Sequence, residues 1–170
     1  MPSDAQIRTD ALSIIKQAEK LPSLVVFDLD YTIWPFWCEV KTTRSQPRLY
    51  PEVRGIFEAL KEAGIPMAVA SRTPSPNIAT VFLGKLQLTS LFAQQEIYPT
   101  FTHKTEHFKA LLQGTKVPYE DMLFFDDEDR NVDTISPMGV KCVLVEDGVN
   151  LSALREGLAK FQKSRKRPAA

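Results

Sequence analysis

The chain has 170 residues, 44% of them hydrophobic and 25% charged, which is typical of one globular domain large enough to fold without disulfide bonds. Positive and negative side chains are equal in number, so the formal net charge is zero. This balance argues against a nucleic-acid partner and against attraction to an anionic membrane surface. The two cysteines, Cys38 and Cys142, match no metal-ligand spacing and are expected to be reduced thiols.

The N-terminal segment lacks the basic and apolar stretches of a secretory signal. No stretch of the chain approaches the roughly 18 consecutive apolar residues of a membrane span, so we expect a cytoplasmic protein with no membrane partner. Residues 10–20 carry apolar side chains at loose helical spacing, with Thr9 and Asp10 as possible caps and Pro22 as a stop. We interpret residues 1–22 as a helical extension without chemistry of its own.

The rest of the chain alternates short apolar runs with segments of helical spacing. The apolar runs, which predict buried strands, are 24–27, 66–70, 122–125 and 140–145, and residues 92–97 are expected to form a further short strand. The segments of helical spacing are 52–64, 78–86, 103–113, 132–138 and 151–161. The alternation implies right-handed crossovers and a doubly wound α/β fold, with a mainly parallel sheet and helices on both faces.

We expect this domain to span residues 23–161, with an irregular segment at residues 33–50 and a basic tail at residues 162–170. The tail is interpreted as a solvated terminus, and a weak targeting or nucleic-acid patch is the alternative.

Polar residues directly follow three of the predicted strands, at the edge where open α/β sheets bind ligands. They are Asp28 and Asp30, Ser71 and Arg72, and Asp126 and Asp127. Aspartate and serine also favour strand ends and helix caps for structural reasons. That preference explains one such site easily but explains three in order poorly. We therefore expect these side chains to form one functional site.

The segment Asp28-Leu29-Asp30-Tyr31-Thr32 matches in full the first motif, Asp-x-Asp-x-Thr, of the haloacid dehalogenase (HAD) superfamily of phosphotransferases. With Ser71, Lys104 and the pair Asp126-Asp127 in the order of the other motifs, residues 23–147 resemble that superfamily. The resemblance implies that Asp28 attacks phosphorus and forms an aspartyl-phosphate, and that Asp30 is the general acid and base.

The same resemblance implies the remaining roles. Ser71 and Lys104 bind phosphate oxygens, and Thr32 supports Asp30. Mg²⁺, which prefers oxygen ligands, is held by the side chains of Asp28 and Asp126 and the backbone carbonyl of Asp30. Such a set suits phosphoryl transfer, in which catalysis is mainly positioning and neutralisation of charge.

Alternatives remain at several of these positions. Lys109 and Lys85 are the other candidates for the lysine. His103 and His107, which flank Lys104, are interpreted as surface or capping residues. For Asp127, stabilisation of a helix N-terminus explains the carboxylate as well as a function does.

The intervals between the motifs, residues 31–70 and 72–103, are too short to hold a cap domain in addition to their helices and strands. The site should therefore be open or covered by a loop. That loop, Tyr31-Thr32-Ile33-Trp34-Pro35-Phe36-Trp37, resembles the eukaryotic magnesium-dependent phosphatase-1 group, as do the segments 70–72, 96–99 and 124–128. The resemblance implies that Trp37, Arg72 and the backbone of Leu29 contact substrate, although aromatic clusters more often belong to a core.

These patterns predict a capless, HAD-like, magnesium-dependent phosphatase. Its expected partners are phosphotyrosine-like or sugar phosphates, carried on a phosphopeptide or a small molecule, and the expected oligomeric state is a monomer or a weak dimer. A phosphotransferase or phosphomutase on the same site is an alternative, although such enzymes usually need a cap to exclude water. A non-catalytic HAD-like binding or scaffold protein is another, although it would be expected to have lost Asp28 or Asp30.

Overall fold

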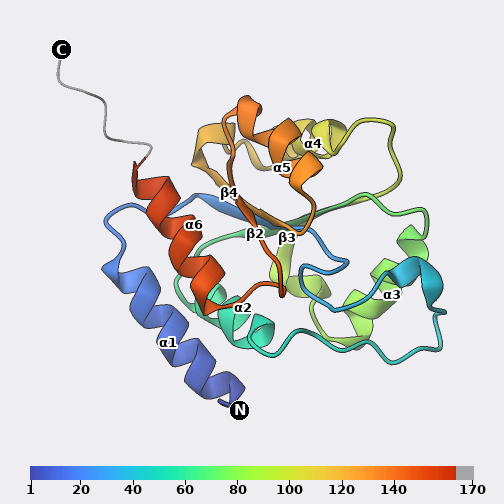
Figure 1. Ribbon diagram of the computed structural model, residues 1–170, viewed down its shortest axis with the longest axis horizontal. Coiled ribbons are helices and arrows are strands. Elements are labelled where there is room, and N and C mark those ends of the chain that lie inside the picture. Colours follow the sequence, from blue (N-terminus) through green and yellow to red (C-terminus); the bar gives the residue numbers. More distant parts are fainter. Residues whose placement is uncertain (164–170) are drawn as a thin grey trace.

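Five parallel strands form a single sheet in the computed structural model, which describes residues 1–163 (Figure 1). The strands are β1 (Leu24–Phe27), β2 (Met67–Ser71), β3 (Phe92–Ile97), β4 (Met122–Asp126) and β5 (Lys141–Leu144). Their order is β3-β2-β1-β4-β5, so the chain starts in the middle of the sheet, runs to one edge and then to the other. This arrangement confirms the doubly wound α/β fold and creates a switch point beside the end of β1, where such sheets bind ligands.

Six helices cover the two faces of the sheet. They are α1 (Asp4–Gln17), α2 (Val53–Glu62), α3 (Pro76–Lys85), α4 (Thr105–Thr115), α5 (Asp129–Ile135) and α6 (Leu151–Lys163). Helices α4 and α5 lie on one side of the sheet, and the other four lie on the opposite side (Figure 1). Helices on both faces bury both faces of the three inner strands, β1, β2 and β4, which is why these strands are apolar almost to their last residue.

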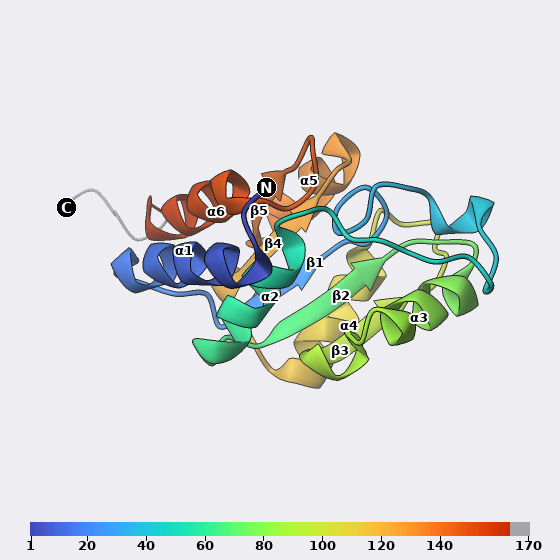
Figure 2. The ribbon, with the colours of Figure 1, turned by 90° about the horizontal axis from the view of Figure 1, so that it is seen from below.

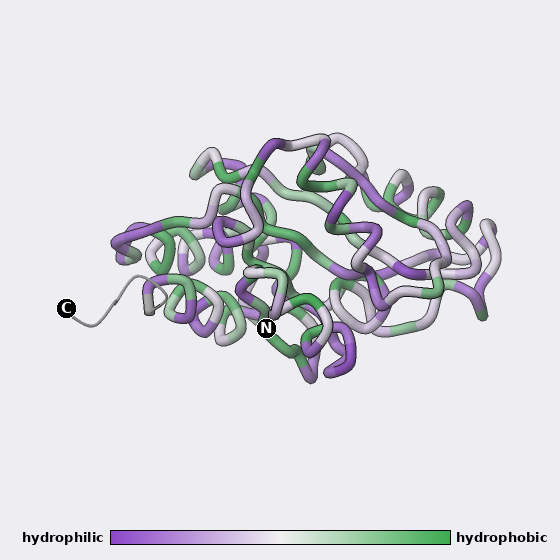
Figure 3. The backbone as a smooth tube through the Cα atoms, turned by 90° about the horizontal axis from the view of Figure 1, so that it is seen from above, coloured by the Kyte–Doolittle hydropathy of each residue, from purple (hydrophilic) through white to green (hydrophobic). Residues whose placement is uncertain are grey.

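Alternate residues of β1 belong to different halves of the core. Val25 and Phe27 pack in the larger cluster, with α1, α2, α3 and α6. Leu24 and Val26 pack in the smaller one, below α4 and α5. All four side chains are buried, and Figure 3 shows hydrophobic positions concentrated in the inner segments of the chain. The central strand is therefore held rigidly from both sides, and it positions the residues that follow it.

Helix α1 begins earlier than the sequence pattern predicted. Ser3 is its N-cap and accepts a hydrogen bond from the Gln6 N–H at 3.1 Å, whereas we had expected a start near residue 10. The helix lies beside α2 and α6 (Figure 2). A Cβ on Gly55 would lie 2.6 Å from the Ile7 Cβ, so the glycine is what allows α1 and α2 to approach. Helix α1 is consequently part of the main core.

The bounds of other elements also differ from prediction, most informatively those of α4 and α5. Helix α4 begins at Thr105, because Lys104 is its N-cap in the left-handed conformation, with φ 70°. Helix α5 occupies Asp129–Ile135, and residues 136–138, expected to belong to it, form a 3-10 turn. Pro137 has no N–H to donate to the preceding turn, so the α-helix ends before it.

Both intervals between the motifs contain only the elements of the sheet domain. Between β1 and β2 the chain forms a loop, a 3-10 turn at Cys38–Val40 and α2; between β2 and α4 it forms α3, a 3-10 turn and β3. Residues 28–104 thus hold no inserted cap, as their length predicted. Across the described chain, every helix is too short or too polar to cross a membrane. Most of the predicted basic tail lies outside the described residues.

Candidate active site

Polar residues at the ends of β1, β2 and β4 line one pocket of about 340 Å³, whereas Asp126 lies outside its lining. Seven of the site residues predicted from the sequence line this pocket: Asp28, Asp30, Trp37, Ser71, Arg72, Lys104 and Asp127. The remaining lining residues are Glu39, Thr73, Pro74, Pro99, Thr100, Glu128, Arg130 and Asn131. The carboxyl ends of neighbouring parallel strands meet at one edge, so residues far apart in the sequence converge there. A pocket of this volume can hold a phosphorylated small molecule or side chain.

Asp28 is fixed in position by partners on both carboxylate oxygens. Its N–H donates to the Phe125 carbonyl at 3.0 Å, which extends the pairing of β1 with β4. Its Oδ2 accepts from the Thr32 hydroxyl at 2.9 Å, and its Oδ1 accepts from Lys104 Nζ at 2.7 Å. The Thr32 side chain therefore contacts Asp28 and, at 3.5 Å, Asp127 Oδ1, and its expected support of Asp30 comes through the turn between them. The Thr32 N–H also donates to the Leu29 carbonyl and closes the turn.

Lys104 connects Asp28 to the end of β4. Its Nζ lies 2.6 Å from Asp126 Oδ2, and its side chain is only 2% exposed. Burial lowers the pKa of this ammonium group, but the carboxylates of Asp126 and Asp28 outweigh burial and raise the pKa above its ordinary value. The lysine is therefore charged. Lys85 instead binds the Ser45 carbonyl at the surface, and Lys109 is exposed, so neither alternative reaches the pocket.

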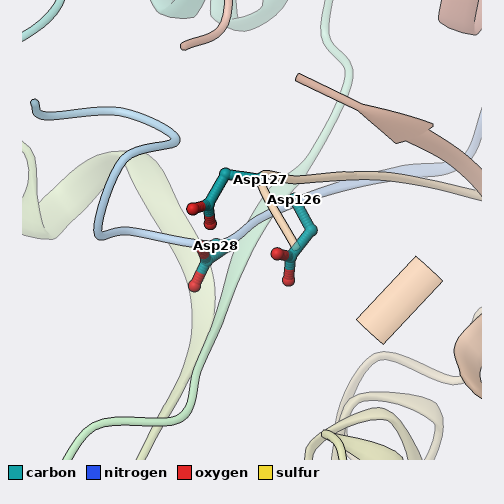
Figure 4. Close-up of side chains that lie close together, drawn as sticks. All are labelled: Asp28, Asp126 and Asp127. Carbon is teal, nitrogen blue, oxygen red and sulfur yellow. The ribbon is translucent and has the colours of Figure 1, made fainter. Parts of the chain in front are cut away.

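Three carboxylates, from Asp28, Asp126 and Asp127, each offer a ligand oxygen within 4.8 Å of the others (Figure 4). Burial raises the pKa of Asp126 and of Asp127, and the negative charge of Asp28 raises both further. A cation would relieve this repulsion, and Lys104 contacts only two of the three groups. The donor set consists of hard oxygens, which suits Mg²⁺ or Ca²⁺ better than softer metals. The residues present thus fit a hard divalent ion.

Asp30 is held by the loop that follows it. Its Oδ1 accepts from Trp34 Nε1 at 2.7 Å and from the Cys38 N–H at 3.2 Å. Tyr31 adopts a positive φ of 56°, which turns the chain so that its N–H donates to the Trp34 carbonyl. Burial is the main reason why the pKa of Asp30 is raised, although both hydrogen bonds lower it. A carboxyl group in this setting is suited to holding and releasing a proton.

The two tryptophans of the loop differ in environment. Trp34 is fully buried and stacks on Phe36, so it belongs to the core. Trp37 is 52% exposed, lines the pocket and meets Tyr31 edge to face. The exposed indole is thus available to a ligand. Leu29, whose backbone was expected to contact substrate, is buried and does not line the pocket in the part of the chain that is described.

Three buried polar residues at or near the pocket, Thr73, His107 and Asn131, were not recognised in the sequence. Asn131, in the first turn of α5, donates from Nδ2 to Asp126 Oδ2 at 3.1 Å, and its spacing of five residues from Asp126 was the available signal. His107 is fully buried, so the interpretation of both histidines as surface or capping residues was wrong for His107. Its spacing of four residues from Leu111, which places both side chains on one face of α4, was the available signal. The two cysteines are free and buried.

Comparison with known proteins agrees with this geometry. The sequence profile of the acid phosphatase family matches residues 20–48 and 42–164. Human magnesium-dependent phosphatase 1 is 41% identical over 164 residues, which cover 88% of this chain and 92% of that protein. A HAD-like hydrolase superfamily protein of Schizosaccharomyces pombe is 30% identical over 142 residues, covering 69% of this chain and 82% of that protein.

The fold is also found among solved structures. A HAD-superfamily hydrolase from Ehrlichia chaffeensis superimposes with a TM-score of 0.67 at 14% sequence identity, covering 85% of this chain and 99% of that chain. The family profile spans most of the sequence, and the relatives of similar sequence are named as a phosphatase and a HAD-like hydrolase. The chain therefore belongs to the acid phosphatase family and is a HAD-like phosphatase, related to the magnesium-dependent phosphatases.

Proposed function

We propose that the chain hydrolyses phosphate monoesters, of the phosphotyrosine-like or sugar-phosphate class, through an aspartyl-phosphate on Asp28. The observation that carries this proposal is the position of Asp28 in the lining of the pocket. It is within hydrogen-bonding reach of Lys104, shares a cluster with two other carboxylates and has the carboxyl group of Asp30 lining the same cavity.

The cofactor we propose is Mg²⁺, the ion named for the related phosphatases. The side chains of Asp28 and Asp126 and the backbone carbonyl of Asp30 would hold it, and Asp127 is a further candidate because its carboxylate joins the cluster. When bound, Mg²⁺ neutralises charge on the phosphoryl oxygens, which lets an anionic nucleophile approach an anionic substrate.

In the first step a carboxylate oxygen of Asp28 forms a bond to phosphorus as the bond from phosphorus to the ester oxygen breaks. Asp30 donates its proton to that leaving oxygen, so the alcohol departs neutral. Lys104 offsets part of the negative charge beside Asp28. Ser71 and Arg72, at the end of β2, supply a hydroxyl and a guanidinium for the transferred group, and a guanidinium can hold a phosphate through two hydrogen bonds.

In the second step the Asp30 carboxylate takes a proton from water, whose oxygen attacks phosphorus. The bond between phosphorus and the Asp28 oxygen breaks, inorganic phosphate leaves, and both aspartates return to their starting state. The contacts of Asp30 Oδ1 with Trp34 and Cys38 keep the carboxyl group oriented through both steps. Trp37 would contact the leaving group, since it is exposed at the mouth of the pocket.

Rapid-quench labelling tests this proposal. The protein is mixed with Mg²⁺ and a ³²P-labelled aryl phosphate and quenched in acid, and the label retained on protein is counted. We expect label that is stable in acid and released by hydroxylamine, as an acyl phosphate requires, and none on Asp28→Asn. Turnover by Asp28→Asn, or a label that resists hydroxylamine, contradicts the mechanism.

A further inference from the structure

His107 is a buried titratable group that the proposed reaction does not use directly. It lies on α4, three residues after Lys104, and is fully buried. Its Nε2 lies 2.9 Å from the Ser71 carbonyl and 3.2 Å from the Tyr98 carbonyl. A carbonyl oxygen can only accept a hydrogen bond, so Nε2 must carry the proton and share it between the two oxygens.

The other ring nitrogen of His107, Nδ1, has a different environment. Nδ1 is buried and has no hydrogen-bond partner among the residues that the structure describes. The ring stacks on Tyr98, with ring centroids 4.1 Å apart. Burial lowers the pKa of His107, and nearby Lys104 lowers it further. The imidazole is therefore neutral and held in the single tautomer that donates to Ser71 and Tyr98.

The two carbonyls that His107 contacts mark the ends of β2 and β3. The Tyr98 N–H also donates to the Ser71 carbonyl at 3.1 Å, so that carbonyl accepts from both neighbours. Ser71 lines the pocket from β2, and Lys104 lines it from the start of α4. Lys104 has a left-handed backbone conformation, so the regular hydrogen-bond pattern of α4 ends there and does not connect the helix to β2. His107 makes the direct polar link from α4 to the end of β2.

We propose that His107 is a positioning residue that fixes Ser71, on β2, relative to Lys104, at the N-cap of α4, so that both meet the same phosphoryl group. This inference rests on the proposed function, because it assumes that Ser71 and Lys104 bind phosphate. A buried histidine could alternatively serve stability alone. The two roles predict different phosphate affinities for a His107 variant that still folds. Loss of a positioning residue weakens phosphate binding, whereas loss of a residue that serves stability alone does not.

A matched pair of variants separates these roles. His107→Gln keeps a side-chain N–H donor, while His107→Leu has a similar apolar volume and no donor. We expect His107→Leu to lower kcat/KM for an aryl phosphate by about 10- to 100-fold and to weaken inhibition by inorganic phosphate, because displacement of about 1 Å between binding groups has effects of that size. His107→Gln should recover most of both values. His103→Leu, on the half-buried neighbouring histidine, is the control and should leave both values unchanged.

Two outcomes overturn the inference. One is an unchanged inhibition constant for inorganic phosphate in folded His107→Leu, as judged by circular dichroism, which assigns the residue to stability. The other is a ¹⁵N NMR spectrum of the wild-type protein at neutral pH that shows the proton on Nδ1, a measurement that needs no variant to fold. Failure of the proposed function has a different signature, because wild-type protein would then retain no label in the rapid-quench experiment, whichever tautomer His107 adopts.

Discussion

The ammonium group of Lys104 lies 2.7 Å from Asp28 Oδ1, although the two residues are 76 positions apart in the sequence. The same ammonium group contacts Asp126, so it joins the ends of β1 and β4 to the start of α4. Neither Lys104 nor Asp126 is more than 2% exposed, so water contributes little to the screening of these charges. We therefore expect the ion pairs to affect both stability and catalysis.

Replacing Lys104 measures how much the two ion pairs contribute to stability. Lys104→Met leaves the Asp28 and Asp126 carboxylates without their cation, and breaking a buried pair of this kind costs about 3–5 kcal/mol in the free energy of unfolding. Urea unfolding without metal measures this loss, and added Mg²⁺ should restore part of it. Lys109→Met, on the exposed side of the same helix, is the matched control and should change stability by less than about 0.5 kcal/mol. Equal effects of the two variants would contradict the assignment of Lys104.

Asp30→Asn tests general acid–base catalysis. The amide oxygen can still accept from Trp34 and Cys38, so the fold should be unchanged, but the side chain cannot donate the proton of a carboxylic acid. We expect kcat/KM, which reports phosphorylation of Asp28 and not the later attack of water, to fall by about 10²- to 10⁴-fold for a sugar phosphate and by less for p-nitrophenyl phosphate, whose leaving group needs little protonation. Steady-state rates with the two substrates measure the difference. An equal loss for both substrates would argue against Asp30 as the acid.

Asp127→Asn tests whether the third carboxylate of the cluster contributes to metal affinity. The variant removes one negative charge from the cluster of Asp28, Asp126 and Asp127, so a higher Mg²⁺ concentration should be needed for half-maximal activity. Titration of Mg²⁺ after treatment with EDTA measures this value, and calorimetry measures binding directly. Asp129→Asn, on the exposed side chain nearby, should leave the Mg²⁺ requirement unchanged. A similar shift in both variants would indicate a general charge effect.

The two tryptophans of the loop should respond oppositely to truncation. Trp37→Ala should raise KM and change the preference between aryl and sugar phosphates with little loss of stability, since the side chain is 52% exposed. Trp34→Ala removes a fully buried ring and should cost about 3–5 kcal/mol in the free energy of unfolding. Kinetics on both substrate classes and urea unfolding of both variants provide the test. Unfolding of Trp37→Ala at low urea would instead assign Trp37 to the core.

His107 should make stability depend on pH in the acidic range. Its pKa is lowered in the folded protein by burial, while Lys104 also lowers it and Glu96 and the carbonyls of Ser71 and Tyr98 act in the opposite direction. The unfolded chain therefore binds the proton first as the pH falls below the ordinary value of 6.5. Wild-type protein should then lose stability relative to His107→Gln, by about 1.4 kcal/mol per pH unit until the folded-state pKa is reached. Urea unfolding of both proteins between about pH 7 and pH 5 measures this difference. A constant difference would contradict a buried, neutral imidazole.

The strands and the first motif were predictable because their signals are local. The continuous apolar run 24–27 is typical of a strand that is buried on both faces, and it has the predicted bounds in the structure. Residues 92–97 also have the predicted bounds, although only Phe92 of that strand is buried. The order of strands and helices then places the polar residues at one edge of the sheet. Asp28, Ser71 and Asp126 could be expected to converge there because that edge follows from the topology.

Other features depend on contacts that span the chain. The start of α1 was missed because its apolar residues are widely spaced, and they are buried by packing against α2 and α6, which a local pattern cannot show. The metal candidate Asp127, the contact of Thr32 with Asp28 and the different exposures of Trp34 and Trp37 follow from side-chain directions in the folded loop.

The sequence by itself thus determined the fold class, the family and the edge of the sheet where the chemistry lies, since these follow from hydrophobic pattern and motif order. Only the tertiary structure decided which polar groups touch. His107 reaches the carbonyls of Ser71 and Tyr98 because α4 packs over the ends of β2 and β3, and hydrogen bonds require donor and acceptor to lie within about 3.2 Å of one another. The number of residues between two groups in the sequence does not predict whether they lie within that distance in the fold.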